Sequence, residues 1–158
     1  MRRTGADRAG PEGRITVNVL YFGTYRAEYS RNRILIEGLR RSGVRLVECH
    51  ERLWRDIDDR VSVVSGGWRS PGFWWRTART YIRLVTRWRG LRRGIDVVVV
   101  GYPGPLDVFP ARLLAWWMRC PLVWDVFMSV HLVAMERGLA ERSASAVRAL
   151  AIVERLAM

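Results

Sequence analysis

The feature that most constrains this chain is an uninterrupted run of apolar, β-branched residues that ends abruptly in a loop of glycine and proline. The run covers Ile95 and, after one aspartate, Val97–Val100, and the loop is 101–107, GYPGPLD. A β-branched run without polar alternation predicts a strand covered on both faces, as in a parallel sheet between layers of helices. Ligands of such sheets bind beyond the carboxyl ends of the strands, so this loop is the first candidate binding segment.

The rest of the chain alternates strand-like and helix-like segments. Predicted strands are 15–22, 44–49, a short one at 61–64, 95–100 and 122–127, and predicted helices are 30–42, 73–93, 111–118 and 133–158. Ser30 is the predicted N-cap of the first helix, and Gly43 is its predicted stop. The alternation predicts an α/β fold, a Rossmann-like, doubly wound parallel sheet with helices on both faces. Residues 14–158 form one domain in this interpretation, and the polar segment 1–13 is a disordered lead-in.

The sequence also indicates which strands are neighbours. Arg45 and Glu48 make the second strand polar, which is typical of a sheet edge, so the first and central strands are predicted to lie side by side. Such a reversal of strand order opens a crevice, here lined by the loops 23–26 and 101–103 and by the segment 125–129. The candidate ligand-binding residues of the two loops are Gly23, Thr24, Tyr25, Arg26, Gly101, Tyr102 and Pro103.

Two residues near the last predicted strand are candidates for acid–base chemistry. Asp125 follows an otherwise apolar strand, and an acid there must be paired or hydrogen-bonded if it is buried. It is therefore either a structural hydrogen-bonding group or a functional base. His131 is a candidate because histidine is the commonest acid–base side chain, although a single histidine is often a surface or capping residue. A Ser/His/Asp triad, a GxGxxG fingerprint and a GxxxxGK[ST] loop are all absent from the sequence.

The formal net charge of +12 arises from 27 basic residues, all arginine, against 15 acidic ones. The field of such a chain favours anionic partners. On helix 73–93, Arg76, Arg79, Arg83 and Arg87 recur at spacings of three and four, with Trp74, Ala78, Ile82, Val85 and Trp88 largely on the other side.

This helix has three interpretations. It is a solvated face over the sheet, a membrane-surface helix with Trp74, Trp75 and the four arginines at anionic headgroups, or a nucleic-acid-binding element. The last is the weakest because no helix-turn-helix, finger or RNP motif accompanies it.

Cys49 and Cys120 lie at the edges of apolar runs without CxxC spacing or a histidine cluster. This pattern predicts buried free thiols and no bound metal. No apolar run approaches the length of a membrane span, and residues 1–13 lack the apolar core of a signal peptide. We therefore expect a cytoplasmic protein that is peripheral on the inner face of the plasma membrane.

Four segments together resemble a known family. They are 19–25 (VLYFGTY), 32–39 (NRILIEGL) with Gly43 and Val44, 96–101 (DVVVVG) and 121–125 (PLVWD). In order and spacing these segments are similar to the N-terminal half of a GT-B glycosyltransferase of the family 4-like group, over residues 14–158. The resemblance implies two Rossmann-like domains facing a cleft. The N-terminal domain holds the acceptor, the C-terminal domain holds the nucleotide-sugar donor, and transfer needs no bound metal or other cofactor.

The resemblance also assigns roles to residues. The segment 23–26 resembles the first, glycine-containing loop of the family, and 101–103 resembles the loop of the central strand, which makes both acceptor-binding. Asp125 and His131 fall in the segment that the family often places near the transferred sugar, which makes them the catalytic candidates.

The chain has no donor domain, so we expect it to be incomplete at its C-terminal end, inactive alone and completed by a donor-domain chain. The alternative is a non-catalytic binding module that docks on an anionic membrane or a protein partner.

Overall fold

The computed structural model describes residues 16–53, 70–136, 138, 141 and 144–158. Its elements, in chain order, are β1 (Asn18–Gly23), α1 (Ser30–Arg41), β2 (Arg45–His50), α3 (Pro71–Leu91), β3 (Val97–Val100), α4 (Val108–Met118), β4 (Leu122–Trp124), α5 (Val130–Glu136) and α7 (Ala144–Ala157). The predicted lead-in 1–13 and the predicted short strand 61–64 lie outside the described residues.

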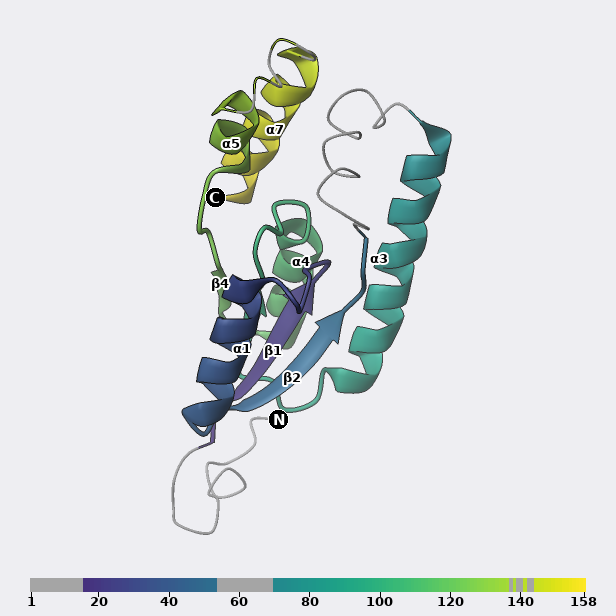
Figure 1. The fold of residues 1–158 in the computed structure, drawn as a ribbon. Helices are drawn as coiled ribbons and strands as arrows, with labels where there is room; N and C mark the ends of the chain where they lie inside the picture. Colours follow the sequence, from purple (N-terminus) through teal and green to yellow (C-terminus); the bar gives the residue numbers. More distant parts are fainter. Residues whose placement is uncertain (1–15, 54–69, 137, 139–140, 142–143) are drawn as a thin grey trace.

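The four strands form one parallel sheet in the order β2-β1-β3-β4 (Figure 1). β1 pairs with β2 from Asn18 opposite Arg45, and on its other side with β3 from Val19 opposite Val97. The predicted neighbourhood of the first and central strands is therefore confirmed, as is the outer place of the second strand. The chain has an α/β fold whose sheet is flanked by helices, an arrangement consistent with a Rossmann-like fold.

Alternate side chains of β1 enter two separate cores, because successive residues of a strand point to opposite faces. Leu20 and Phe22 pack with residues of α3 and α4. Val19 and Tyr21 pack on the other face with Ile36 of α1. Figure 1 shows the result, with α1 on one side of β1 and β2 and α3 on the other.

The ends of α1 test two predictions. Gly43 has φ 79°, and the amides of Gly43 and Val44 donate to the carbonyls of Arg40 and Leu39 at 3.2 and 3.3 Å. This is a Schellman motif, so the predicted glycine stop is confirmed. The predicted N-cap is wrong. Ser30 is the first helical residue, and the cap position belongs to Tyr29, whose backbone is extended.

The face of α3 that packs on the sheet also differs from the prediction. Thr77, Thr80, Leu84 and Trp88 are its buried residues. Of the residues expected opposite the arginines, Trp88 is buried and Val85 is partly buried against the same core, whereas Trp74, Ala78 and Ile82 are exposed. Leu84 and Trp88 pack in the core with the strands, and Thr80 Oγ1 donates to the carbonyl of Arg76 at 2.9 Å.

The C-terminal part of the chain departs furthest from expectation. In the described part of the predicted single helix 133–158, α5 and α7 are separate helices, with Gly138 at φ 66° between them. The predicted strand 122–127 ends at Trp124, because the amide of Asp125 makes the last bond to β3 and that of Val126 turns back to Trp124. α4 begins three residues before its predicted start at 111. In the described part of the chain no helix has the length and apolarity needed to cross a bilayer.

Candidate functional site

The carboxyl ends of β1, β3 and β4 bring together the three segments that the sequence predicted to line a crevice. Gly23 ends β1, Gly101 follows β3 and Asp125 follows β4. The amide of Gly101 donates to Phe22 O at 3.3 Å, and that of Asp125 donates to Val100 O at 3.0 Å. Strand order reverses at this point, since β1 lies between β2 and β3. Reversal points of open α/β sheets are where their ligands bind, so this edge is the candidate site.

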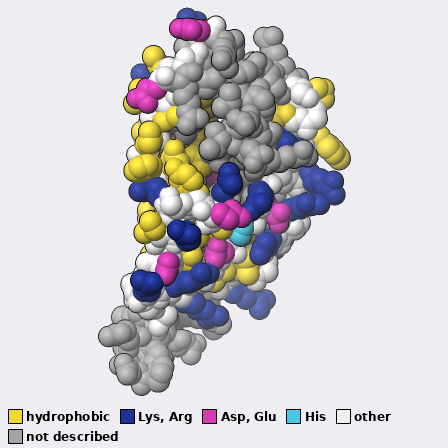
Figure 2. Space-filling model, viewed as in Figure 1, with side chains coloured by type: hydrophobic (Ala, Val, Ile, Leu, Met, Phe, Trp, Pro, Cys, Tyr) yellow, Lys and Arg dark blue, Asp and Glu magenta, His cyan; other side chains and the backbone are white. Residues whose placement is uncertain are grey.

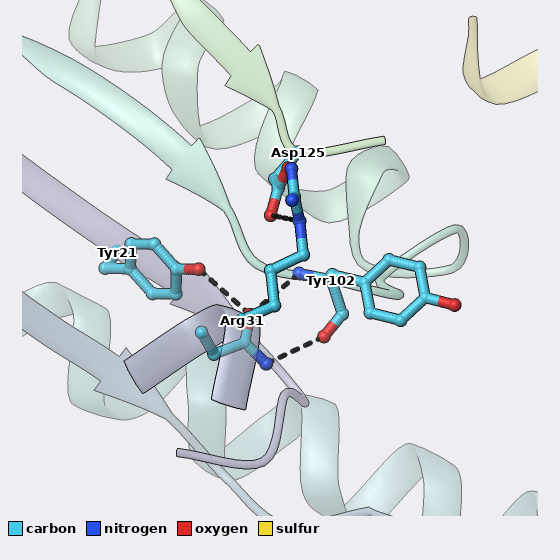
Figure 3. Close-up of polar contacts among 5 residues, drawn as sticks. Tyr21, Arg31, Tyr102 and Asp125 are labelled. Carbon is cyan, nitrogen blue, oxygen red and sulfur yellow. Dashed lines mark hydrogen bonds and ion pairs between the residues drawn. The ribbon is translucent and has the colours of Figure 1, made fainter. Parts of the chain in front are cut away.

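Asn32, in the first turn of α1, joins the segments. Its side chain is fully buried, at 0% exposure. The Oδ1 atom accepts from Tyr21 Oη at 3.0 Å and from the amide of Tyr102 at 3.1 Å. The Nδ2 atom donates to the carbonyls of Arg26 at 3.1 Å and Tyr102 at 2.9 Å. The amide group thus uses two acceptor and two donor positions, and Figure 3 shows Tyr21 and Tyr102 converging on this point.

The sequence interpretation missed Asn32. One signal for it exists, because Asn32 precedes the buried Ile36 by four residues and therefore lies on the apolar face of α1. An amide in that position needs buried hydrogen-bond partners.

Arg31 and Asp125 form a two-pronged ion pair across the edge (Figure 3). Arg31 Nη2 lies 2.5 Å from Asp125 Oδ1, and Arg31 Nε lies 2.9 Å from Oδ2. The side chains are 38% and 10% exposed. The pKa of the Arg31 guanidinium is raised, first by its hydrogen bond to Asp125. Asp125 therefore has the hydrogen-bonded environment that one of its two interpretations required, and the partner, 94 residues away, was not foreseen.

Three aromatic rings form a surface beside this ion pair, which we call the aromatic platform: Tyr29, Tyr102 and Phe127. The rings of Tyr29 and Tyr102 stack with centroids 5.7 Å apart, and that of Phe127 meets Tyr102 edge-on at 5.8 Å. The Arg31 guanidinium lies 4.5 Å from the centre of the Phe127 ring. Tyr29 and Phe127 are exposed. The platform offers flat apolar faces next to a cation, which suits a ligand with an apolar ring face and polar or anionic substituents.

The first loop faces inward. Thr24 is buried, and its amide and Oγ1 donate to Asp107 Oδ2 at 2.8 and 3.0 Å. A Cβ on Gly23, at φ 137°, would lie 2.8 Å from the same oxygen. Tyr25 is also buried and donates to Glu48 Oε2 at 3.0 Å. Burial is the main cause that raises the pKa of Tyr25. Thr24 and Tyr25, which were predicted to contact a ligand, are therefore bonded to other residues inside the protein.

Asp107, which the sequence interpretation did not single out, holds this loop to α3. It is 1% exposed, and its Oδ1 accepts from Tyr81 Oη at 2.7 Å. Burial, followed by Asp107, raises the pKa of Tyr81. Three donors from two elements thus meet one carboxyl group.

Three remaining loop candidates differ in exposure. Gly101 is buried, and a Cβ there would lie 2.7 Å from Tyr21 Cε1. A glycine at this position therefore leaves room for the ring of Tyr21. Pro103 is half-buried and follows a cis peptide bond. Arg26 is half-buried, and its Nε is buried without a hydrogen-bond partner among the described residues.

His131 lies on α5 and is tied to α7. Its Nδ1 is 3.2 Å from the carbonyl of Val147, and its amide is 3.4 Å from Glu154 Oε2. These contacts place its ring at the interface of the two C-terminal helices, and the structure does not pair it with Asp125.

The membrane-surface candidates of α3 divide into two groups. Trp74, Trp75, Arg79 and Arg83 are exposed, so the tryptophans and arginines share the solvent side of the helix. Figure 2 shows dark-blue side chains along this flank. Arg76 is half-buried, and Arg87, although exposed, donates to the carbonyl of His50 at 3.3 Å.

The described residues contain no group of three or more His, Cys, Asp or Glu side chains arranged to hold a metal ion. Cys49 and Cys120 are free thiols, the first buried and the second half-buried. Comparison of the chain with known protein families, with characterised proteins and with solved structures found no match.

Proposed function

We propose that this chain is the acceptor-side domain of a glycosyltransferase, built as one Rossmann-like, doubly wound half of a GT-B enzyme. It holds a glycan or lipid-linked acceptor, while a donor domain supplied elsewhere holds the nucleotide-sugar. The observation that carries the proposal is the aromatic platform at the reversal of strand order, with the Arg31–Asp125 pair beside it. Sugar rings present apolar C–H faces that pack on exposed aromatic rings, and their hydroxyl groups pair with charged side chains.

The residues around the platform support acceptor binding by this chain and catalysis that depends on the donor domain. Asp125 is engaged by Arg31 and His131 by α7, so neither is an unengaged acid or base in this state. Stabilising the leaving diphosphate needs preorganised charge on the donor side. We therefore expect the isolated chain to bind an acceptor and to transfer no sugar.

Calorimetric titration tests this. The chain is titrated with a panel of nucleotide-sugars, and separately with oligosaccharides and short-chain polyprenyl-phosphate-linked sugars. Members of the acceptor panel should bind, and the nucleotide-sugars should not. Tyr29→Ala and Phe127→Ala should each weaken acceptor binding about tenfold, because each removes a stacking contact of about 1–1.5 kcal/mol. Trp116→Ala, which removes an exposed aromatic ring on α4, away from the platform, is the control and should have no effect. Tight binding of a nucleotide-sugar without any acceptor binding would overturn the proposal.

A second candidate function, a non-catalytic module that docks on an anionic membrane, is favoured by the solvent side of α3. Trp75 is 73% exposed and lies on the same side of the helix as Arg79 and Arg83. Interfacial helices combine apolar anchors with cations in this way, and each cation near an anionic surface contributes about 1 kcal/mol.

Vesicle sedimentation tests this function with a charge-matched control. Arg79, Arg83 and Arg89 are changed to Glu in one variant, and the exposed Arg33, Arg45 and Arg148 in the other. Each variant lowers the formal charge of +12 by six, to +6. If α3 is the membrane face, the first variant should bind phosphatidylglycerol vesicles about a hundredfold more weakly than wild type, and the second much less so. Equal losses would show that binding follows net charge and would contradict a specific membrane face.

A further inference from the structure

The side of β4 that faces away from β3 is a second candidate binding surface, separate from the aromatic platform. β4 is the last strand of the order β2-β1-β3-β4, and its described partner is β3. The carbonyl of Pro121 accepts from Val98, and the amide of Asp125 donates to Val100. Because alternate residues of a parallel strand bond to opposite sides, Leu122 and Trp124 direct backbone groups away from β3; of these, the carbonyl of Trp124 already accepts one bond, from the amide of Val126 at 3.1 Å. Such an edge is a template for another strand.

A groove adjoins this edge. A pocket of about 540 Å³ lies between α4, β4 and the end of α7, and its walls include Ala115, Trp116, Leu122, Val126 and Met158. The lining is apolar except for Arg112, whose Nη1 donates to the carbonyl of Leu156 at 3.0 Å. Apolar side chains projecting from an added strand would enter this groove.

The groove also contains an unused hydrogen-bond donor. Trp124 lines it, and the Nε1 atom of Trp124 is buried with no hydrogen-bond partner among the described residues. A buried indole N–H normally finds an acceptor. A backbone carbonyl of an occupant would supply one.

Exposed apolar side chains lie beside the groove. Leu113, Trp116 and Trp117 of α4 are exposed, with Trp116 at 76%. Figure 2 shows a further band of hydrophobic side chains along the edge of the molecule formed by the β4–α5 connection and α5. Exposed apolar patches mark interaction sites.

Charge decides between possible occupants. Arg112 lines the groove, and the exposed Arg119 and Arg155 are close in sequence to the lining residues Cys120 and Ala157, whereas Glu154 is buried and accepts from Ser129 Oγ at 2.7 Å. A second copy of the chain would bring another net charge of +12 against this cationic rim. The rim instead complements acidic residues.

We propose that the β4 edge and its groove receive an extended, apolar strand of an acidic protein partner, which becomes the fifth strand of the sheet. Backbone groups of Leu122 and Trp124 pair with the strand, apolar side chains fill the groove, and flanking Asp or Glu residues meet Arg112, Arg119 and Arg155. This is recognition by β-strand addition, in which main-chain bonds supply affinity and side-chain pockets supply specificity.

The experiment uses the full chain and a displayed library of random twelve-residue peptides. Selected peptides should alternate β-branched or aromatic residues with others and carry acidic flanks. The best peptide is then synthesised in three forms: unchanged, with Lys in place of its acidic flanks, and with alternate backbone nitrogens methylated. The second and third forms should bind at least tenfold more weakly. Hydrogen exchange at the amides of Leu122 and Trp124, and at the Trp124 indole, should slow only with the unchanged peptide.

Two protein variants complete the test. Arg112→Glu with Arg119→Glu should weaken binding of the unchanged peptide at least tenfold, while Arg33→Glu with Arg45→Glu, on α1 and β2, which do not line the groove, should not. The proposal is overturned if the library yields no binder, if all three peptide forms bind equally, or if protection appears away from β4. It is also overturned if sedimentation equilibrium shows a dimer of the chain whose formation protects Leu122 and Trp124, because a second copy would then be the occupant.

Discussion

The substitution Asn32→Asp tests whether one buried amide holds the candidate site together. It keeps the size and shape of the side chain and removes only the two donors. The carbonyls of Arg26 and Tyr102, at 3.1 and 2.9 Å from Nδ2, would then face a carboxyl group. An orphaned buried acceptor costs about 1–3 kcal/mol, so the variant should lose about 4 kcal/mol of its free energy of unfolding. That is a large share of the roughly 5–15 kcal/mol that stabilises a typical domain.

Urea unfolding followed by tryptophan fluorescence measures the loss. With a slope of about 2 kcal/mol per molar urea, the midpoint should fall by about 2 M. Burial disfavours the charged form of the introduced carboxyl, so its pKa in the folded state is raised above the unfolded value of about 3.9. The cost of ionisation is absent below that value and grows as the pH rises, so the deficit should be smaller at pH 4 than at pH 8.

The matched control for Asn32→Asp is Ser30→Asp, which adds the same charge at an exposed position of the same helix turn. It should change the free energy of unfolding by no more than about 1 kcal/mol, in the stabilising direction, because an acid favours a helix N-terminus. If Asn32→Asp stays within about 1 kcal/mol of wild type at pH 8, the amide does not hold the three segments, and the reasoning fails.

Three further predictions concern the interior. Asp107→Ala orphans the amide and hydroxyl of Thr24 and the hydroxyl of Tyr81, and should cost about 3–5 kcal/mol in urea unfolding; a loss under about 1 kcal/mol would refute this. Gly101→Ala sets a Cβ 2.7 Å from the Tyr21 ring and should cost about 1–3 kcal/mol, whereas Gly38→Ala, in open space on α1, should stabilise slightly; the reverse order would contradict the packing. Burial raises the pKa of the Cys49 thiol to about 11. At pH 8 this thiol should therefore react with Ellman's reagent on the order of a hundredfold more slowly than an ordinary thiol, and its reaction rate should rise with pH up to about 11. A fast reaction in the Cys120→Ala variant would contradict the burial of Cys49.

The candidate site was only partly readable from the sequence. The loops 23–26 and 101–103 and the segment at Asp125 were expected to meet, because parallel strands end at one edge of a sheet, and the structure brings them together. The inward direction of Thr24 and Tyr25 was not expected, since it depends on Asp107 and Glu48, which are 83 and 23 residues away from them. The pairing of Arg31 with Asp125 was not expected either, because these residues are 94 positions apart in the sequence. Such contacts join residues that no local pattern relates.

The sequence by itself determined the existence of the four described strands, the stop of α1 at Gly43 and the place of the second strand outside the first. These follow from local physics: β-branched runs favour strands, glycine adopts positive φ, and polar residues favour a sheet edge. Only the tertiary structure decided which side of α3 packs and where the C-terminal helix divides. The helix periodicity allowed more than one buried stripe, and packing against the sheet selected the one through Leu84 and Trp88. The division near Gly138 lets α5 and α7 pack on each other, which one straight helix cannot do.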